Sequence, residues 1–283
     1  MVNESEISRL QGIAAELRYR VVTMMGPGKV HHFGGSLSAA DIITALYFYK
    51  MRYDPKNPAW QERDRFIMSK GHSVPVQYAA LAMLGVFPLE ELSTLKVLGT
   101  RLQGHPAMHL LPGIEGCTGA LGEGLSYANG MALAGRVKGL NYHVYCLIGD
   151  GELQEGQIWE AAMTTPKKCL TQVTAIIDRN RLKAMDEADC AKMIDPLADR
   201  WESFGWAARE LDGHDLRALC EGLDWATSQT DKPTLLICNT IKGKGISFIE
   251  NQAAFHNAAI PANQFEQALT QVEMNYRNFE VKR

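Results

Sequence analysis

The sequence predicts an α/β fold in which a parallel sheet is flanked by helices and follows a long helical N-terminal extension. The first observation behind this prediction is that, from residue 142 onward, short runs of branched and aromatic residues alternate with helical patterns. Such alternation is typical of βαβ units, whose parallel sheets are covered on both faces. The second observation is a hydrophobic content of 46%, which is ample for a packed core. We find no internal repeat and no low-complexity linker, and therefore expect one domain over residues 1–283.

Residues 1–115 have the pattern of helix and loop. Ser38 and Asp41 have the spacing of a capping box and predict that a helix begins just before the segment IITALYFY. Two further short helices are expected at 78–84 and 89–95. An apolar stripe at helical spacing predicts the first helix of the chain, through Ile7, Leu10, Ala14, Leu17 and Val21.

Residues 116–257 form the expected βαβ core. It opens with a glycine-rich turn and a helix over 116–136, where small residues recur every four positions and permit close packing. Residues 258–283 are expected to add one surface helix. The expected strands are 142–148, 172–178, 205–211 and 233–240, and the expected helices lie near 156–165, 196–204 and 214–227.

Composition and charge exclude several classes of protein. The net charge of −3 comes without a basic run, so we expect no nucleic-acid partner. No segment reaches the ~18 apolar residues of a membrane helix, and the N-terminus lacks a signal-peptide pattern, which favours a cytoplasmic protein. The six cysteines lack metal-binding spacing and are expected to be reduced, so neither a zinc site nor a disulfide framework is indicated.

Polar side chains follow two neighbouring strands of the expected sheet. Asp150, between Gly149 and Gly151, ends one strand, and Asn180 ends the next. Because the carboxyl ends of parallel strands lie at the same edge of a sheet, both side chains should face one crevice. A carboxylate and an amide oxygen suit Mg²⁺, and the two glycines leave room for a diphosphate bound to that ion. The alternative is an ordinary turn, since Gly and Asp are common turn residues.

Several loop histidines are candidates for proton transfer or for stabilising charge near neutral pH. Their spacing fits no zinc pattern. For any one of them the alternative is a hydrogen-bonded structural residue, which is our interpretation of the remaining three, His109, His143 and His214. The candidates are His31, His32, His72, His105 and His256.

Eight stretches, in order along the chain, resemble the transketolase family, and specifically the N-terminal half that binds the diphosphate of thiamine diphosphate. They are HFGGSLSAADIITALY, DRFIMSKGHSVPVQYAAL, LQGHPAM, PGIEGCTGALGEGLSYANGMALA, GDGELQEGQIWEAA, DRNRL, LDGHDLRAL and IKGKGISFIEN. The resemblance runs from about residue 10 to 257. It implies a diphosphate-binding α/β domain and an enzyme that transfers a two-carbon ketol unit from a ketose to an aldose, each a sugar or a sugar phosphate.

The resemblance also implies a metal and a cofactor site. Asp150 and Asn180 would bind Mg²⁺, Ca²⁺ or Mn²⁺ through their side chains, and Leu182 through its carbonyl oxygen. The residues implied to lie against the diphosphate are Gly149, Gly151, His72 and His256.

Further roles concern the aminopyrimidine, the substrate and the subunit interface. Gly119 and Leu121 would line the aminopyrimidine end of the cofactor. His32 and His105 would face the substrate and, with His72 and His256, make up the implied catalytic histidines. Glu155 falls where the family has a glutamate beside the cofactor at the subunit interface, where a buried carboxylate needs a partner or a raised pKa.

The resemblance covers only part of a full-length transketolase. In the family, the second half supplies the pyrimidine-binding domain, with the glutamate that promotes ylid formation, and most groups that hold the sugar phosphate. The implied partner is therefore a separate C-terminal subunit with the pyrimidine-binding and C-terminal domains, in an assembly of two copies of each chain.

Three positions depart from the family pattern. His31 stands where glycine is usual, Glu123 where glutamine is usual, and residues 183–186 read KAMD in place of QIDG. These changes leave the metal ligands intact and bear on the substrate and the partner. Two alternatives stay open: an enzyme similar to deoxyxylulose-phosphate synthase, and a non-catalytic paralogue that binds and regulates a partner. The segments LQGHP and GDGELQEGQIWEA favour transketolase over the first, and the intact metal ligands and loop histidines count against the second.

Overall fold

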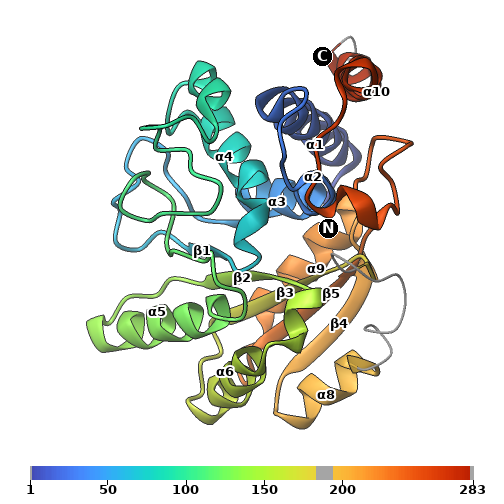
Figure 1. Cartoon of the computed structure of the whole chain (residues 1–283). Coiled ribbons are helices and arrows are strands. Elements are labelled where there is room, and N and C mark those ends of the chain that lie inside the picture. The colour runs from blue at the N-terminus through green and yellow to red at the C-terminus, as the bar shows by residue number, and fades with distance from the viewer. Residues whose placement is uncertain (1, 183–193, 281–283) are drawn as a thin grey trace.

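A sheet of five parallel strands lies at the centre of the protein, in the order β1-β2-β3-β5-β4 (Figure 1). This computed structural model describes residues 2–182 and 194–280. The predicted parallel sheet flanked by helices is confirmed, and the four predicted strands lie within two residues of their observed bounds. The strands are β1 (Arg65–Met68), β2 (Val144–Gly149), β3 (Val173–Arg179), β4 (Ala207–Asp212) and β5 (Thr234–Asn239).

Helices cover both faces of the sheet (Figure 1). One face carries α1 (Glu4–Met25), α2 (Phe33–Ser38), α3 (Ala40–Ala45), α4 (Val74–Met83) and α9 (Leu216–Ser228), with α10 (Ala262–Glu280) lying against α1. The other face carries α5 (Gly124–Lys138), α6 (Gly156–Lys167) and α8 (Leu197–Ser203). Along β2, Tyr145 and Leu147 pack into the first layer, whereas Val144, Cys146 and Ile148 pack into the second. Burial on both sides explains why the strands read as continuous apolar runs.

Short turns of helix complete the chain. A π-helical turn, η1 (Leu46–Lys50), follows α3, and 3₁₀ turns occur at η2 (Gly71–Ser73), η3 (Leu89–Thr94), η4 (Gly151–Gln154) and η5 (Ala253–His256). The helix predicted at 89–95 is thus 3₁₀ rather than α. The helix predicted at 78–84 starts earlier, at Val74, with a proline in its first turn.

Two expectations for the N-terminal part are wrong. The extension is not only helix and loop, because it contributes the edge strand β1, a run of four residues beside a charged segment. The capping box is also absent: α3 begins after Ala39 without a side-chain cap. Ser38 instead donates a 2.6 Å hydrogen bond to Asp178, and Asp41 pairs with Arg18 and His214. Tertiary partners far along the chain have replaced the local cap.

Because all five strands are parallel, their carboxyl ends lie at one edge of the sheet. The segments that follow β1, β2, β3 and β5 begin at Ser69, Asp150, Asn180 and Thr240, so four separate loops meet there. This convergence creates the site.

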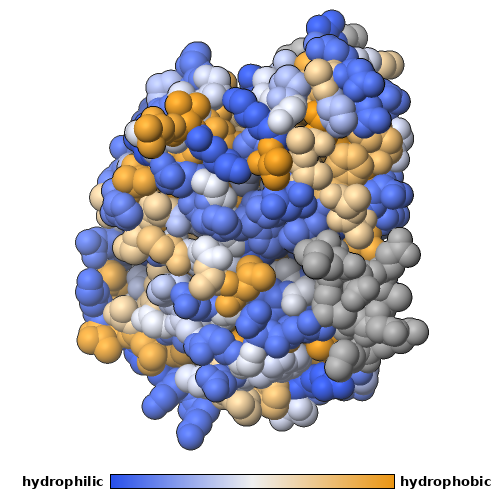
Figure 2. Space-filling view, in the orientation of Figure 1, coloured by the Kyte–Doolittle hydropathy of each residue, from blue (hydrophilic) through white to orange (hydrophobic). Residues whose placement is uncertain are grey.

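Apolar side chains on the face drawn in Figure 2 form separate groups divided by hydrophilic residues. Among the residues that the structure describes, no helix has both the length and the apolar character needed to cross a membrane.

Candidate functional site

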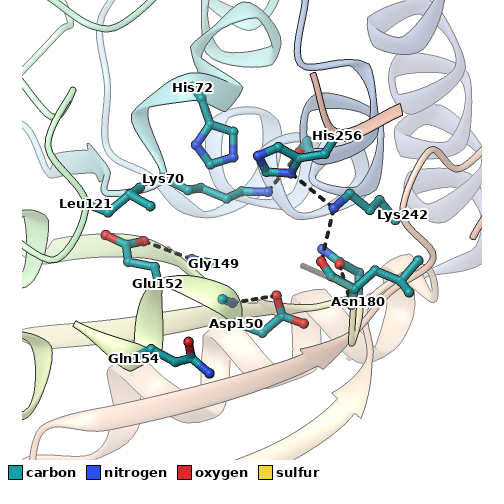
Figure 3. Close-up of a pocket in the computed structure, with 13 residues that line it drawn as sticks. Lys70, His72, Leu121, Gly149, Asp150, Glu152, Gln154, Asn180, Lys242 and His256 are labelled. Atoms are coloured by element: carbon teal, nitrogen blue, oxygen red, sulfur yellow. Dashed lines mark hydrogen bonds between the residues drawn. The ribbon is translucent and has the colours of Figure 1, made fainter. Parts of the chain in front are cut away.

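A cavity of about 250 Å³ opens at the carboxyl edge of the sheet. Its floor comes from the loops after β2 and β3, and its roof from the loop after β1 and from the segments around Lys242 and His256 (Figure 3). The predicted site residues that line it are His72, Leu121, Gly149, Asp150, Gly151, Asn180, Leu182 and His256.

The predicted oxygen ligands come together on the floor of this cavity. One Asp150 oxygen accepts a 2.8 Å hydrogen bond from the Gly151 amide, and the other accepts from the Arg181 amide, where the backbone turns through a positive φ of 61°. Burial, with a smaller contribution from the nearby charge of Asp178, raises the pKa of Asp150 to about 6. A buried carboxylate with a raised pKa is a group that a cation would stabilise.

The other two predicted ligands follow β3. The Asn180 side-chain oxygen accepts a 3.2 Å hydrogen bond from the Leu182 amide, and the Leu182 carbonyl accepts a 3.0 Å hydrogen bond from Lys242. No group of three or more His, Cys, Asp or Glu side chains with metal-binding geometry occurs within residues 2–182 and 194–280. A carboxylate, an amide oxygen and a backbone carbonyl are the kinds of oxygen that suit Mg²⁺, which takes few protein ligands and completes its shell with phosphate and water.

The predicted catalytic histidines form one cluster above the floor. Ring centroids lie 4.9 Å apart for His32 and His72, 5.1 Å for His72 and His256, 5.4 Å for His32 and His256, and 6.3 Å for His32 and His105. Burial, helped by neighbouring positive charges, lowers the pKa of His32 and His256 to about 4 and that of His72 well below its usual value. Burial and Lys96 also lower the pKa of His105. Near neutral pH the cluster consists of uncharged imidazoles, each able to accept or donate a hydrogen bond.

His31, the fifth candidate, does not join this cluster. Its side chain is buried, lies edge-on to Phe33, and has a pKa lowered to about 4 by burial. Its backbone pairs with Ala258 in an isolated antiparallel bridge, which ties the loop of His32 to the segment that follows His256. The imidazole that stands in place of the family's glycine packs against Phe33 and does not line the cavity.

Two lysines in the cavity were missed by the sequence analysis. Lys70 forms a buried ion pair with Asp178 and donates a 2.8 Å hydrogen bond to the Gly35 carbonyl. Lys242 lies 3.1 Å from Nδ1 of His256, and burial lowers its pKa to about 8 (Figure 3). The signal was a lysine beside glycine in the segments SKGH and IKGKG. The two ammonium groups offset the charge of the nearby carboxylates of Asp178 and Asp150 and can contact an anionic ligand.

Glu152 was also missed, and it shapes the wall of the cavity. Its carboxylate accepts hydrogen bonds from the Ser69 hydroxyl and from the amides of Gly122 (2.8 Å) and Gly149 (3.0 Å). Burial raises its pKa, although these bonds oppose the rise. Glu152 thereby joins the loops that follow β1 and β2.

The remaining predicted residues lie at the rim. Gly119 is exposed and lies near His105, since a Cβ built on this glycine would be 3.7 Å from the Cβ of His105. Glu155 is exposed in the chain alone and lies against Gly122. Glu123 is exposed at the start of α5, where its carboxylate accepts a 3.4 Å hydrogen bond from Tyr127. The substitutions at 183–186 lie outside the described residues.

The three histidines interpreted as structural are not in the cavity. His109 is exposed, and His143 makes a 2.7 Å hydrogen bond with Thr174 at the opposite end of the sheet. His214 makes hydrogen bonds to Asp41 and to the amide of Ile241.

Comparison with known proteins agrees with this geometry. Residues 11–283 match the family described as transketolase, thiamine diphosphate binding domain. The chain is 41% identical to the 6-deoxy-6-sulfo-D-fructose transketolase subunit SqwG of Clostridium sp. (strain MSTE9), over 96% of this chain and 98% of that subunit. It is 39% identical to one subunit of the apulose-4-phosphate transketolase of Phocaeicola vulgatus, over 97% and 98% of the two chains.

Longer transketolases match over part of their length. Human transketolase is 36% identical over 95% of this chain but only 43% of its own. The crystal structure of the transketolase from Campylobacter jejuni superimposes with a TM-score of 0.83 and 28% identity, covering 99% of this chain and 49% of that one. The chain therefore belongs to the transketolase family, in which it represents the thiamine diphosphate-binding part of the enzyme.

Proposed function

We propose that this chain is the N-terminal subunit of a two-chain transketolase that binds thiamine diphosphate together with a divalent metal ion. The enzyme transfers a two-carbon ketol unit from a ketose to an aldose. The observation that carries the proposal is the convergence, in one cavity, of a buried carboxylate, two lysines and two uncharged histidines, His72 and His256, which His32 contacts. These groups match a metal-bound diphosphate on one side and a polar substrate on the other.

Each part of the cavity has a task in this proposal. Asp150, Asn180 and the Leu182 carbonyl hold Mg²⁺, with Ca²⁺ or Mn²⁺ as the other candidates. Lys70 and Lys242 provide positive charge for the diphosphate. Bound thiamine diphosphate supplies the electron sink for breaking a carbon–carbon bond beside a carbonyl group.

The histidines act on the substrate side. His32 and His105 are uncharged near pH 7, so they can accept a proton from a sugar hydroxyl or donate a hydrogen bond to its carbonyl oxygen. His72 and His256 lie at the level of Lys70 and Lys242 (Figure 3), where they border the diphosphate. In this proposal His72 and His256 serve the cofactor, and His32, which contacts both rings, serves proton transfer with His105.

A separate C-terminal subunit completes the proposed enzyme, in an assembly of two copies of each chain. The support comes from the relatives that match along nearly their entire length, which are named as subunits. Glu155, exposed at the rim and close to Gly122, is the proposed point at which the partner covers the cofactor. The two subunit relatives are named for ketoses that carry a sulfonate or a phosphate, so an anionic ketose is the first donor to test.

The cofactor site is tested with Asp150→Ala. We expect this variant to fold and to lose metal-dependent binding of thiamine diphosphate. Binding is measured by titrating the cofactor into the purified chain assembled with its partner subunit. Gln154→Ala changes a neutral side chain of the same cavity and serves as the matched control, with affinity within about twofold of the native value. Unchanged cofactor binding in the Asp150 variant would refute the assigned metal site.

The substrate role is tested with His105→Ala. Turnover should fall by roughly 10²–10⁴-fold while the affinity for thiamine diphosphate is retained, because general acid–base groups contribute that much to rate. Loss of cofactor affinity instead would place His105 in the cofactor site.

The partner is tested by mild affinity purification of the chain from its native cells, followed by assays with and without thiamine diphosphate and Mg²⁺. A stoichiometric second chain and cofactor-dependent ketol transfer are expected. Activity with pyruvate as donor would favour deoxyxylulose-phosphate synthase chemistry, and a partner bound without any transferase activity would favour the non-catalytic paralogue.

A further inference from the structure

His214 lies outside the cavity but contacts the turn that delivers Lys242 to it. Its Nε2 accepts a 2.8 Å hydrogen bond from the amide of Ile241, the residue before Lys242. Its Nδ1 lies 2.7 Å from Oδ2 of Asp41. Because an amide can only donate, Nε2 must be the unprotonated nitrogen, and Nδ1 carries the proton that is donated to Asp41. The hydrogen bonds at both nitrogens therefore fix one tautomer and one ring orientation.

Asp41 is itself held from the other side by Arg18. The guanidinium contacts both carboxylate oxygens, with Nη1 3.1 Å from Oδ1. Both side chains are largely buried between α1 and α3. Burial alone would raise the pKa of Asp41, but the charge of Arg18 and the hydrogen bonds from His214 and Arg18 lower it, so the carboxylate stays charged. Arg18, Asp41 and His214 thus form a relay, meaning here a chain of hydrogen bonds, that ends at the Ile241 amide.

The turn that contains Ile241 is also held by backbone hydrogen bonds on either side. The amide of Thr240 donates to the Arg179 carbonyl (3.0 Å), and the amide of Gly243 donates to the Gly34 carbonyl (3.0 Å). Between these tethers the Lys242 side chain runs across Gly34, where a Cβ would lie 2.8 Å from its Cγ. A small rotation of the peptide between residues 240 and 241, whose N–H binds His214, would thus displace the ammonium from the cavity.

We propose that His214, oriented by Asp41 and Arg18, is a positioning residue that fixes the Thr240–Ile241 peptide, next to Lys242, and so places the Lys242 ammonium at the diphosphate end of the cavity. The proposal deepens the proposed function, on which it rests. In this proposal a histidine remote from the cofactor contributes to cofactor affinity, and it does so only through Lys242.

Two substitutions of His214 each keep one of the two hydrogen bonds of the ring and remove the other. In His214→Asn the side-chain amide is near the position of Nδ1, so it can still donate to Asp41 but cannot reach Ile241. In His214→Gln the amide oxygen is near the position of Nε2, so it can still accept from Ile241. Both variants lose the ring, and their thermal stability should fall by similar amounts.

The first measurement is the affinity of the assembled two-chain enzyme for thiamine diphosphate at fixed Mg²⁺. We expect His214→Asn to raise the apparent Kd roughly 3- to 10-fold, the value of one hydrogen bond, while His214→Gln stays within about twofold. Turnover at saturating cofactor should be nearly unchanged in both. Hydrogen exchange of the full chain without cofactor should show faster exchange over residues 240–245 in the Asn variant only.

A double-mutant cycle with Lys242→Ala identifies the route. If His214 acts through Lys242, His214→Asn adds no further loss of cofactor affinity in the Lys242→Ala background. A full additional loss there, equal losses in the Asn and Gln variants, or an unchanged Kd in His214→Asn would each overturn the proposal. Native enzyme that fails to bind thiamine diphosphate at all would instead overturn the proposed function.

A variant on the other side of the bond guards against misfolding of the His214 variants. Ile241→Pro removes the donor and leaves the relay intact, and Thr240, which directly follows β5, can take the extended backbone that precedes proline. The same rise in Kd is expected from this variant. Native affinity in folded Ile241→Pro would refute the role of the bond.

Discussion

Arg18 and Arg20, two residues apart on α1, should differ sharply in their contribution to stability. Arg18 pairs with Asp41, and their side chains are only 12% and 7% exposed, whereas Arg20 pairs with Glu16 at 29% and 15%. Removing one partner of a buried pair leaves an uncompensated charge and costs about 3–5 kcal/mol. Because Asp41 keeps its bond to His214, we expect Arg18→Met to lose about 3 kcal/mol. For a chain of 283 residues this corresponds to roughly 5 °C in Tm.

Arg20→Met is the matched control. Its ion pair spans one helical turn near the surface, so its loss should cost less than about 1 kcal/mol. Both variants would be measured by urea and thermal unfolding of the purified chain without cofactor. Equal losses from the two substitutions would refute the argument that burial decides the cost.

The dependence on pH gives a second check. In the native chain the folded-state pKa of Asp41 is depressed, so its contribution to stability is present above the unfolded value of about 3.9 and is lost as pH falls through the folded value. Without Arg18, the effect of burial is no longer opposed by the guanidinium charge, and the folded-state pKa rises. The gap in stability between native and Arg18→Met should therefore be largest near pH 7.5, narrow as pH falls, and close only below the unfolded value of about 3.9. A gap that is constant with pH would show that lost packing, and not the charge of Asp41, is the cause.

Two further predictions concern packing and metal. Gly71→Ala places a Cβ 2.0 Å from the Thr118 carbonyl oxygen and should lower the free energy of unfolding by about 1–3 kcal/mol or more. Gly130→Ala, exposed on α5 with open space around it, should raise the free energy of unfolding by roughly 0.5–1 kcal/mol. Urea unfolding compares the two variants, and similar effects would contradict the assigned contacts. Removal of divalent metal with EDTA should abolish ketol transfer by the assembled enzyme and Mg²⁺ should restore it, as followed by product formation; full activity in EDTA would argue against the metal site.

The sheet could be predicted because its strands are buried on both faces. Complete burial selects the uninterrupted runs of branched residues that mark β2, β3 and β5. β1 escaped prediction because its pattern is only four residues long and is preceded by charged residues. The capping box misled for a different reason: Ser38 and Asp41 bind groups 140 and 173 positions away, and no local rule contains such partners.

The candidate site could be predicted where a motif fixed the backbone, as at Asp150 and Asn180, and much less where tertiary burial decides. Lysine is ordinarily solvated, so the glycine beside Lys70 could indicate a loop but not that Lys70 would be almost fully buried against Asp178. The same holds for His214, whose neighbours in the sequence do not reveal that its ring lies between α3 and the turn after β5. Its interpretation as a hydrogen-bonded structural residue agrees with its bonds to Asp41 and Ile241, but its place beside Ile241 emerged only from the fold.

The predicted histidines of the cavity and the lysines that were not predicted affect one another electrostatically. Burial is the larger cause of the low pKa of His72 and His256, and the positive charges of Lys70 and Lys242 lower it further. The lysines thus serve two purposes in the proposed enzyme, because they attract a diphosphate and also keep the neighbouring imidazoles uncharged. A cavity lined by histidine alone would gain positive charge, and lose proton acceptors, on acidification. Lys242, whose pKa of about 8 keeps it mostly charged near pH 7, provides attraction for an anion, and the histidines remain free to exchange protons with a substrate.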